Sequence, residues 1–286
     1  MSDRLDLVAA GQRPAAILNT RRVNEVLARA AAAGLAGVPG DALGEDGRGR
    51  LAAKSTETQV YIARTREAAL RLRDLDRAVR NANRPEIPVE SHALGAALGY
   101  PDCCAWAYPH TAFEQPGEGE DVRWARNFVW RAGPGRVGPW SPWLNFHAAR
   151  VFGLDFFEHL PCCPWCRATQ ERNQALVAAL YDPEGAAQVR AMMTQSVVLW
   201  PDGRFLPFRC TGMEAGILGV AAAGRTQGDV KPHFRDRILD AVPGSSSAAD
   251  INGLRMGNRG WEARLGNRWR SLRSAGRGEP MVLAFR

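Results

Sequence analysis

Hydrophobic residues recur at a helical spacing in the first part of the chain. From Pro14 to Leu35, and again from Ser55 to Arg80, apolar residues return every three or four positions, and charged residues fill the positions between them. Gly34 ends the first of these runs, and Pro85 ends the second helical stretch. We therefore predict that residues 1–85 form a helical N-terminal region.

The pattern changes from Ser196 onward to short apolar runs with the spacing of strands. Val197–Trp200 and Phe205–Phe208 are separated by a Pro-Asp-Gly turn, which is typical of a hairpin. More short runs, separated by glycines, follow to the end of the chain. We predict an α+β fold with three parts: the helical N-terminal part, a helical Cys/His domain and a small β-rich C-terminal unit. Their expected bounds are residues 1–85, 86–191 and 192–286.

Two helices are expected to begin beside cysteines. Ser91 can cap a short helix that ends at Gly99, and Pro101 then starts another helix, with Cys103 and Cys104 in its first turn. A helical pattern also resumes directly after Cys166. Because the N-terminus of a helix favours a thiolate over a thiol, the cysteines at both places are candidates for metal ligands or nucleophiles.

The chain has six cysteines, and five of them fall into two groups. In a reducing cytosol such groups are typical of metal ligands or catalytic thiols rather than of disulfides. A histidine lies close to the second group. The candidate metal ligands are Cys103, Cys104, His159, Cys162 and Cys166. Neither group alone supplies a satisfactory site, so we predict that the two groups meet in space.

Charge and hydropathy limit the partners that we expect. The net charge is +7, but the 35 arginines and two lysines are dispersed among acidic residues. Nucleic-acid binding is not expected, since it needs a basic surface on one side of the molecule. No apolar run approaches the roughly 18 residues of a membrane span, and the first residues lack the pattern of a signal peptide. We expect a cytoplasmic protein without a membrane partner.

Residue spacing leaves several kinds of site open. Cys163 and Cys166 have the C-x-x-C spacing of a redox dithiol, but thioredoxin-like motifs follow a strand, whereas helices are expected here. Four of the candidate ligands can hold a tetrahedral Zn²⁺ ion. The same thiolates would equally hold an iron–sulfur cluster. The sequence does not distinguish these two metal sites.

A haem site is the remaining possibility. His159 and Cys163 form an H-x-x-x-C motif, with three histidines upstream of it. This resembles the motif of haem-dependent peroxygenases that act on 3-methyl-L-tyrosine. The resemblance implies a haem held by one thioether, with an axial histidine for which His92, His110 and His147 are candidates. The cofactor-binding residues would then be His147, His159 and Cys163.

A second resemblance covers a longer part of the chain, about residues 92–180. The stretches Leu98–Cys104 and His159–Cys166, with Asn145 between them, are similar to an uncharacterised prokaryotic family with LGYP-x-CC and H-x-P-C-x-x-x-C blocks. The resemblance implies that the family shares one set of residues. That set is Cys103, Cys104, His159, Cys162 and Cys166. Cys163 is an addition in this sequence.

These observations predict a metal-binding protein. The leading hypothesis is an oxidoreductase with an iron centre held by cysteine and histidine, most specifically a haem-dependent oxygenase or peroxygenase that acts on a small aromatic molecule. The alternative is a non-enzymatic protein with a structural zinc or iron–sulfur site. A closed site with four ligands would favour the alternative, and an open coordination position would favour the enzyme.

Overall fold

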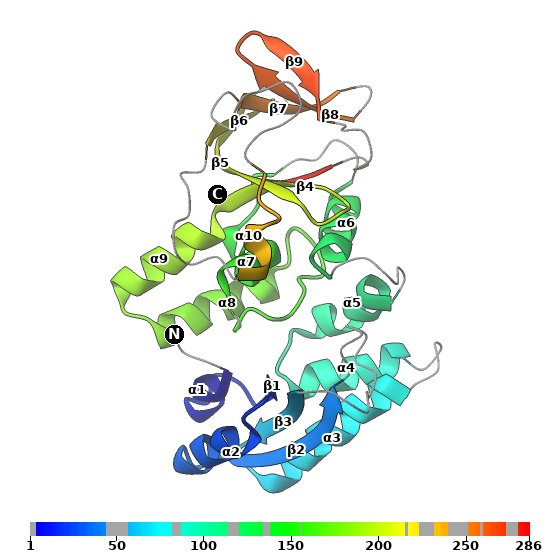
Figure 1. The fold of residues 1–286 in the computed structure, drawn as a ribbon, viewed down its shortest axis with the longest axis vertical. Helices are drawn as coiled ribbons and strands as arrows, with labels where there is room; N and C mark the ends of the chain where they lie inside the picture. The colour runs from blue at the N-terminus through cyan, green and yellow to red at the C-terminus, as the bar shows by residue number, and fades with distance from the viewer. Residues whose placement is uncertain are drawn as a thin grey trace. The chain divides into compact units, whose positions relative to one another are not determined.

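The computed structural model in Figure 1 combines helices with two antiparallel sheets, which confirms the α+β fold class. It describes residues 4–43, 57–81, 87–113, 120–133, 138–154, 156–214, 217–222, 232–239, 251–257, 260–272 and 280–286. The chain forms two compact units, residues 1–110 and 111–286. The three-part division with bounds at residues 85 and 191 stays a prediction.

The first unit is built on a three-stranded sheet with the strand order β1-β3-β2. Alternate residues of the central strand point to opposite faces of a sheet. Val60 and Ile62 therefore pack with residues of the first two helices, while Tyr61 packs with residues of the third. The elements are α1 (Arg4–Ala9), β1 (Ala15–Thr20), α2 (Val23–Ala32), β2 (Ala36–Leu43), β3 (Glu57–Ala63), α3 (Arg66–Asn81), α4 (Ile87–Ala97) and the start of α5 (Asp102–Phe113).

This sheet shows that the prediction of a helical region over residues 1–85 is wrong. The expected helix from Pro14 to Leu35 is strand β1 followed by α2, and the expected helix from Ser55 to Arg80 contains β3 before α3. Apolar runs of six or seven residues fit a strand as well as a helix. Pairing with distant residues decides for the strand, because β1 pairs with β3 along its whole length, from Ala15 opposite Ala63 to Thr20 opposite Thr58.

The second unit is built on a seven-stranded antiparallel sheet with the order β10-β4-β5-β6-β7-β8-β9. Its strands are β4 (Gln195–Leu199), β5 (Phe205–Glu214), β6 (Ile217–Ala222), β7 (Ile251–Gly257), β8 (Gly260–Leu265), β9 (Arg268–Ser271) and β10 (Met281–Leu283). The predicted hairpin is confirmed: Leu199 pairs with Phe205, and the N–H of Gly203 donates to the carbonyl of Trp200 at 2.9 Å.

Helices accompany this sheet in the second unit. They are α6 (Glu120–Ala132), the 3₁₀ helix η1 (Pro142–Leu144), α7 (Phe146–Phe152), α8 (Arg167–Leu180), α9 (Pro183–Met193) and α10 (Pro232–Arg235). The fully buried Asn145 accepts a hydrogen bond from the N–H of Ala148 at the start of α7. Its amide donates to the carbonyls of Met193 and Gln195, both at 2.8 Å. Asn145 thus ties α7 to the junction between α9 and β4.

No helix in the described part of the chain is long and apolar enough to cross a membrane.

Candidate metal centre

The first cysteine pair opens helix α5. Gly99 has a φ of +73° after the end of α4, a conformation that favours glycine. Pro101 then precedes the new helix, and its carbonyl accepts hydrogen bonds from the N–H groups of Cys104 and Ala105. Cys103 and Cys104 therefore lie in the first turn, as the sequence predicts. Ser91 is not a cap, however, because α4 begins four residues earlier, at Ile87.

The second cysteine group lies in a turn that leads into helix α8. The N–H of Cys166 donates to the carbonyl of Cys163 at 3.2 Å, and the carbonyl of Cys166 accepts from the N–H of Gln170 at 3.2 Å. Cys166 is the N-cap residue of α8. Thiols at both helix starts thus lie near the positive end of a helix dipole, which stabilises a thiolate.

Four sulfur atoms come together at these two segments. The Sγ atoms of Cys103, Cys104, Cys162 and Cys166 all lie within 4.8 Å of one another, as expected from the two cysteine groups. The sulfurs of a regular tetrahedron lie about 3.8 Å apart when each is about 2.3 Å from a central zinc ion. Cys104 and Cys166 are buried, and Cys103 is exposed. The four cysteines can therefore hold a metal ion.

Two of the candidate residues lie beside this cluster rather than in it. Cys163 is partly buried, and its Sγ lies 3.7 Å from the Sγ of Cys162. His159 is buried, with its Nε2 3.0 Å from the hydroxyl of Thr169 and its Nδ1 3.2 Å from the guanidinium of Arg172. Their assignment as haem or metal ligands stays a prediction.

A chain of hydrogen bonds runs from His159 to one of the clustered thiols. A guanidinium can only donate, so Arg172 donates to Nδ1 and the ring proton of His159 is on Nε2. Nε2 therefore donates to the Thr169 oxygen. The hydroxyl of Thr169 in turn donates to the Sγ of Cys166 at 3.2 Å. Arg172 also donates to Asn173. Hydrogen bonds of this kind orient a ligand and stabilise its charged form.

Thr169, Arg172 and Asn173 are not among the residues predicted from the sequence. They follow Cys166 by three, six and seven residues, so they lie on one face of α8. Asn173 is buried, and its amide donates to the carbonyl of Trp143 at 2.7 Å, which attaches α8 to η1. The helical spacing after Cys166 is the only signal in the sequence for these residues. That spacing becomes informative only once Cys166 is identified as a ligand.

The other histidines are found in different surroundings. His147 is buried in α7 with its ring 4.8 Å from that of Phe205, centroid to centroid. His92 stacks on Trp106 at 4.1 Å, and its Nε2 lies 2.5 Å from a carboxylate oxygen of Asp102. The side chain of His110 lies outside the described part of the chain. A role for any of the three as an axial haem ligand stays a prediction.

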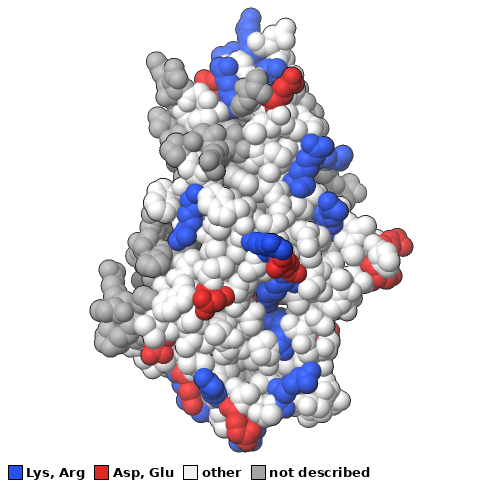
Figure 2. Space-filling view, turned by 180° about the vertical axis from the view of Figure 1, so that it is seen from behind, with Lys and Arg blue, Asp and Glu red and all other residues white. Residues whose placement is uncertain are grey.

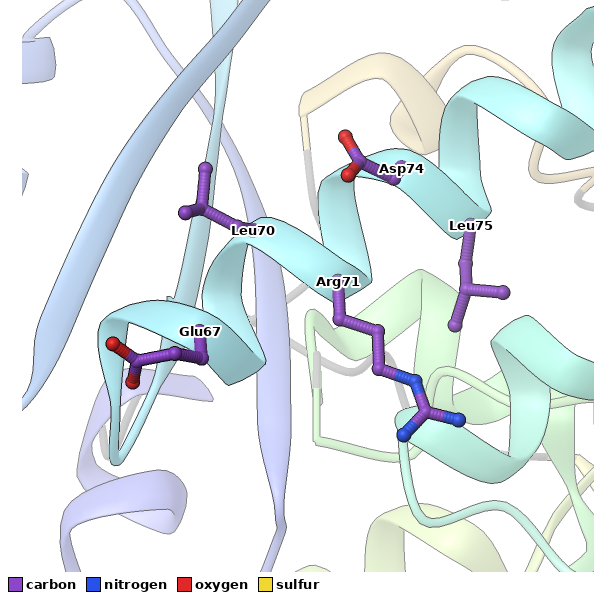
Figure 3. Close-up of a pocket in the computed structure, with 5 residues that line it drawn as sticks. All are labelled: Glu67, Leu70, Arg71, Asp74 and Leu75. Atoms are coloured by element: carbon purple, nitrogen blue, oxygen red, sulfur yellow. The ribbon is translucent and has the colours of Figure 1, made fainter.

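A surface hollow lies along helix α3 (Figure 3). The described residues that line it come from this one helix and include no aromatic, cysteine or histidine side chain. They are Glu67, Leu70, Arg71, Asp74 and Leu75. The hollow is therefore unlike the aromatic pocket that the haem hypothesis needs.

Comparison with known proteins gives no match to a family model, to a curated protein or to a solved structure. The assignment of a function therefore depends on the cysteine cluster itself.

Proposed function

We propose that this chain is a zinc protein, in which Cys103, Cys104, Cys162 and Cys166 bind one Zn²⁺ ion as a structural centre. The observation that carries the proposal is that four thiol sulfurs lie within 4.8 Å of one another. Zinc prefers four tetrahedral ligands at structural sites, and four cysteines form one of the common ligand sets. Four protein ligands leave no coordination position for a substrate, which favours a structural role.

The same spacing favours one ion over an iron–sulfur cluster. In a cluster the four thiolates are divided among two or four irons, with bridging sulfides between the irons. The four cysteine sulfurs must then surround several metal atoms and lie farther apart than around a single ion. Sulfurs within 4.8 Å of one another fit the smaller volume.

The haem and iron hypotheses remain as alternatives, and the metal analysis described below tests them together with the zinc proposal. A haem-dependent oxygenase would use Cys163, whose thiol is outside the group of four, together with His159. A single iron atom could also occupy the four-thiolate site. A cytoplasmic location and a small aromatic substrate belong to this interpretation, and they stay predictions.

Metal analysis of the purified full-length protein tests the proposal. We expect one zinc atom per chain by elemental analysis after desalting, and a colourless solution, because Zn²⁺ has a filled d shell. A red protein with a Soret band that survives denaturation would establish covalent haem instead. A brown or red protein with stoichiometric iron and no Soret band would establish an iron centre in place of zinc.

Loss of the Thr169 hydroxyl should weaken zinc binding. In Thr169→Val the Sγ of Cys166 loses a donor 3.2 Å away, and His159 loses the acceptor for its ring proton. Loss of a hydrogen bond to a metal ligand typically lowers affinity about 10- to 100-fold. Competition with a chromogenic chelator measures the change. Thr169→Ser retains the hydroxyl and is the control, and equal affinities of the two variants would contradict the orienting role.

A further inference from the structure

The excess positive charge of the chain is concentrated at one end of its sequence. Residues 251–286 contain eight arginines and two glutamates, so they carry +6 of the total net charge of +7. The preceding 250 residues are therefore almost neutral. In the chain as a whole the basic residues are dispersed among acidic ones, and this argued against nucleic-acid binding. In residues 251–286 they are not dispersed in this way.

Strands β7, β8 and β9 display many of these arginines on one end of the large sheet. Arg255 pairs with Glu262 across β7 and β8, and Arg264 pairs with Trp269 across β8 and β9, so these four side chains share a face. On the edge strand, Arg268 and Arg270 are exposed. They flank Trp269 in the sequence, so they point to the opposite face of the sheet from its ring. Figure 2 shows arginine side chains gathered at the top of the view, with acidic residues at their margin.

Two of these arginines lie over an aromatic ring. The guanidinium carbon of Arg255 lies 4.1 Å from the ring centre of Trp269, and that of Arg264 lies 5.8 Å from it. Arg255 also forms an ion pair with Glu262, with 2.8 Å between Nε and Oε2. Glu262 is the one acidic residue of the three strands. Arg264 donates to the neutral side chain of Asn252 at 2.8 Å.

We propose that the edge of the large sheet at β9, with the side chains on both of its faces, binds single-stranded nucleic acid. Exposed guanidinium groups of Arg268 and Arg270 bind phosphates, for which their planar fork of donors is suited. The ring of Trp269 and the guanidinium of Arg255 over it offer a platform for a base, because bases stack on aromatic rings and on guanidinium planes alike. This interaction surface does not depend on the zinc centre.

A nucleic acid fits these observations better than an anionic membrane. Membrane-surface binding usually uses an amphipathic helix with apolar side chains on one face, whereas these residues lie on strands of a sheet. A duplex is also a poorer fit, because sequence-reading proteins commonly insert a helix or a two-stranded ribbon into the major groove. An exposed edge with arginines and a stacking platform is typical of surfaces that follow a single strand.

The test measures binding of the full-length protein to a fluorescently labelled single-stranded RNA of mixed sequence by anisotropy, over a range of salt concentrations. The test variant is Arg268→Gln/Arg270→Gln. Removing one arginine–phosphate interaction should lower the slope of log K against log salt by about 0.7, so removing two should lower it by about 1.4 and weaken binding roughly tenfold or more near 0.1 M salt. The matched control is Arg66→Gln/Arg71→Gln on α3, which removes the same charge from two exposed positions.

The expected result is a reduced affinity and slope for the β9 variant, with the α3 control close to the unsubstituted protein. Equal losses in both variants would show that net charge alone attracts RNA and would overturn the proposal. It is also overturned if the protein does not bind the RNA, or if it binds vesicles with anionic lipid and leaves RNA unbound. Circular dichroism of both variants establishes that they are folded.

Discussion

Replacing Cys162 by serine is expected to abolish stoichiometric zinc binding, whereas replacing its neighbour Cys163 is expected to leave it intact. The Sγ of Cys162 belongs to the group of four within 4.8 Å, and that of Cys163 does not. Serine is a poor zinc ligand, so three thiolates remain and the tetrahedral set is incomplete. The two substitutions alter adjacent positions in the same turn, and they differ chiefly in whether a ligand is removed.

Elemental analysis after desalting measures the zinc bound to each variant. Cys210→Ser is a second control, because Cys210 is buried in β5, where burial raises the pKa of its thiol. Full zinc in Cys162→Ser with none in Cys163→Ser would exchange the roles of the two residues. Zinc in every variant would place the ion elsewhere.

Removal of the metal is expected to lower the melting temperature by on the order of 10 °C. A ligand present at about 1,000 times its Kd stabilises the folded state by about 4 kcal/mol, and each kcal/mol shifts the melting temperature of a large domain by about 2–4 °C. The four cysteines come from segments 58 residues apart between Cys104 and Cys162, so the bound ion closes a long loop. Removal of the ion removes this constraint on the chain.

Differential scanning fluorimetry before and after treatment with a strong chelator measures this shift. Adding zinc back, but not magnesium, should restore the original melting temperature, since magnesium prefers oxygen ligands. Cys162→Ser should melt at the lower temperature and should be insensitive to the chelator. An unchanged melting temperature after verified metal removal would contradict a structural role.

The fold could be predicted from the sequence where a signal was local. Gly99 and Pro101 mark the end of one helix and the start of the next, and the Pro-Asp-Gly turn marks the hairpin between β4 and β5. The three-stranded sheet was missed because β1 and β3 are short apolar runs that fit either structure. Their pairing across more than 40 residues, such as Ala15 with Ala63, decides the outcome.

The residues of the candidate site were likewise predictable only in part. Clustering of cysteines on the two segments identified the four sulfurs that come together. Thr169 and Arg172 could not be recognised, because a hydroxyl and a guanidinium on a helix have no distinctive spacing by themselves. Their role is defined by contacts in three dimensions, in which Thr169 meets Cys166 and Arg172 meets His159. Arginines are mixed with acidic residues along most of the chain, so the basic segment at the end of the large sheet was also missed.

The close approach of α4 and α5 has a consequence for protein design. A Cβ atom at Gly95 would lie 2.7 Å from that of Ala105, and one at Gly99 would lie 2.7 Å from Pro14. Residues without any chemistry of their own thus set where the cysteines of α5 lie. Grafting only Cys103 and Cys104 onto the helix start of another scaffold would omit this packing. A transplant that preserves the thiol positions must carry Gly95, Gly99 and Pro101 with them.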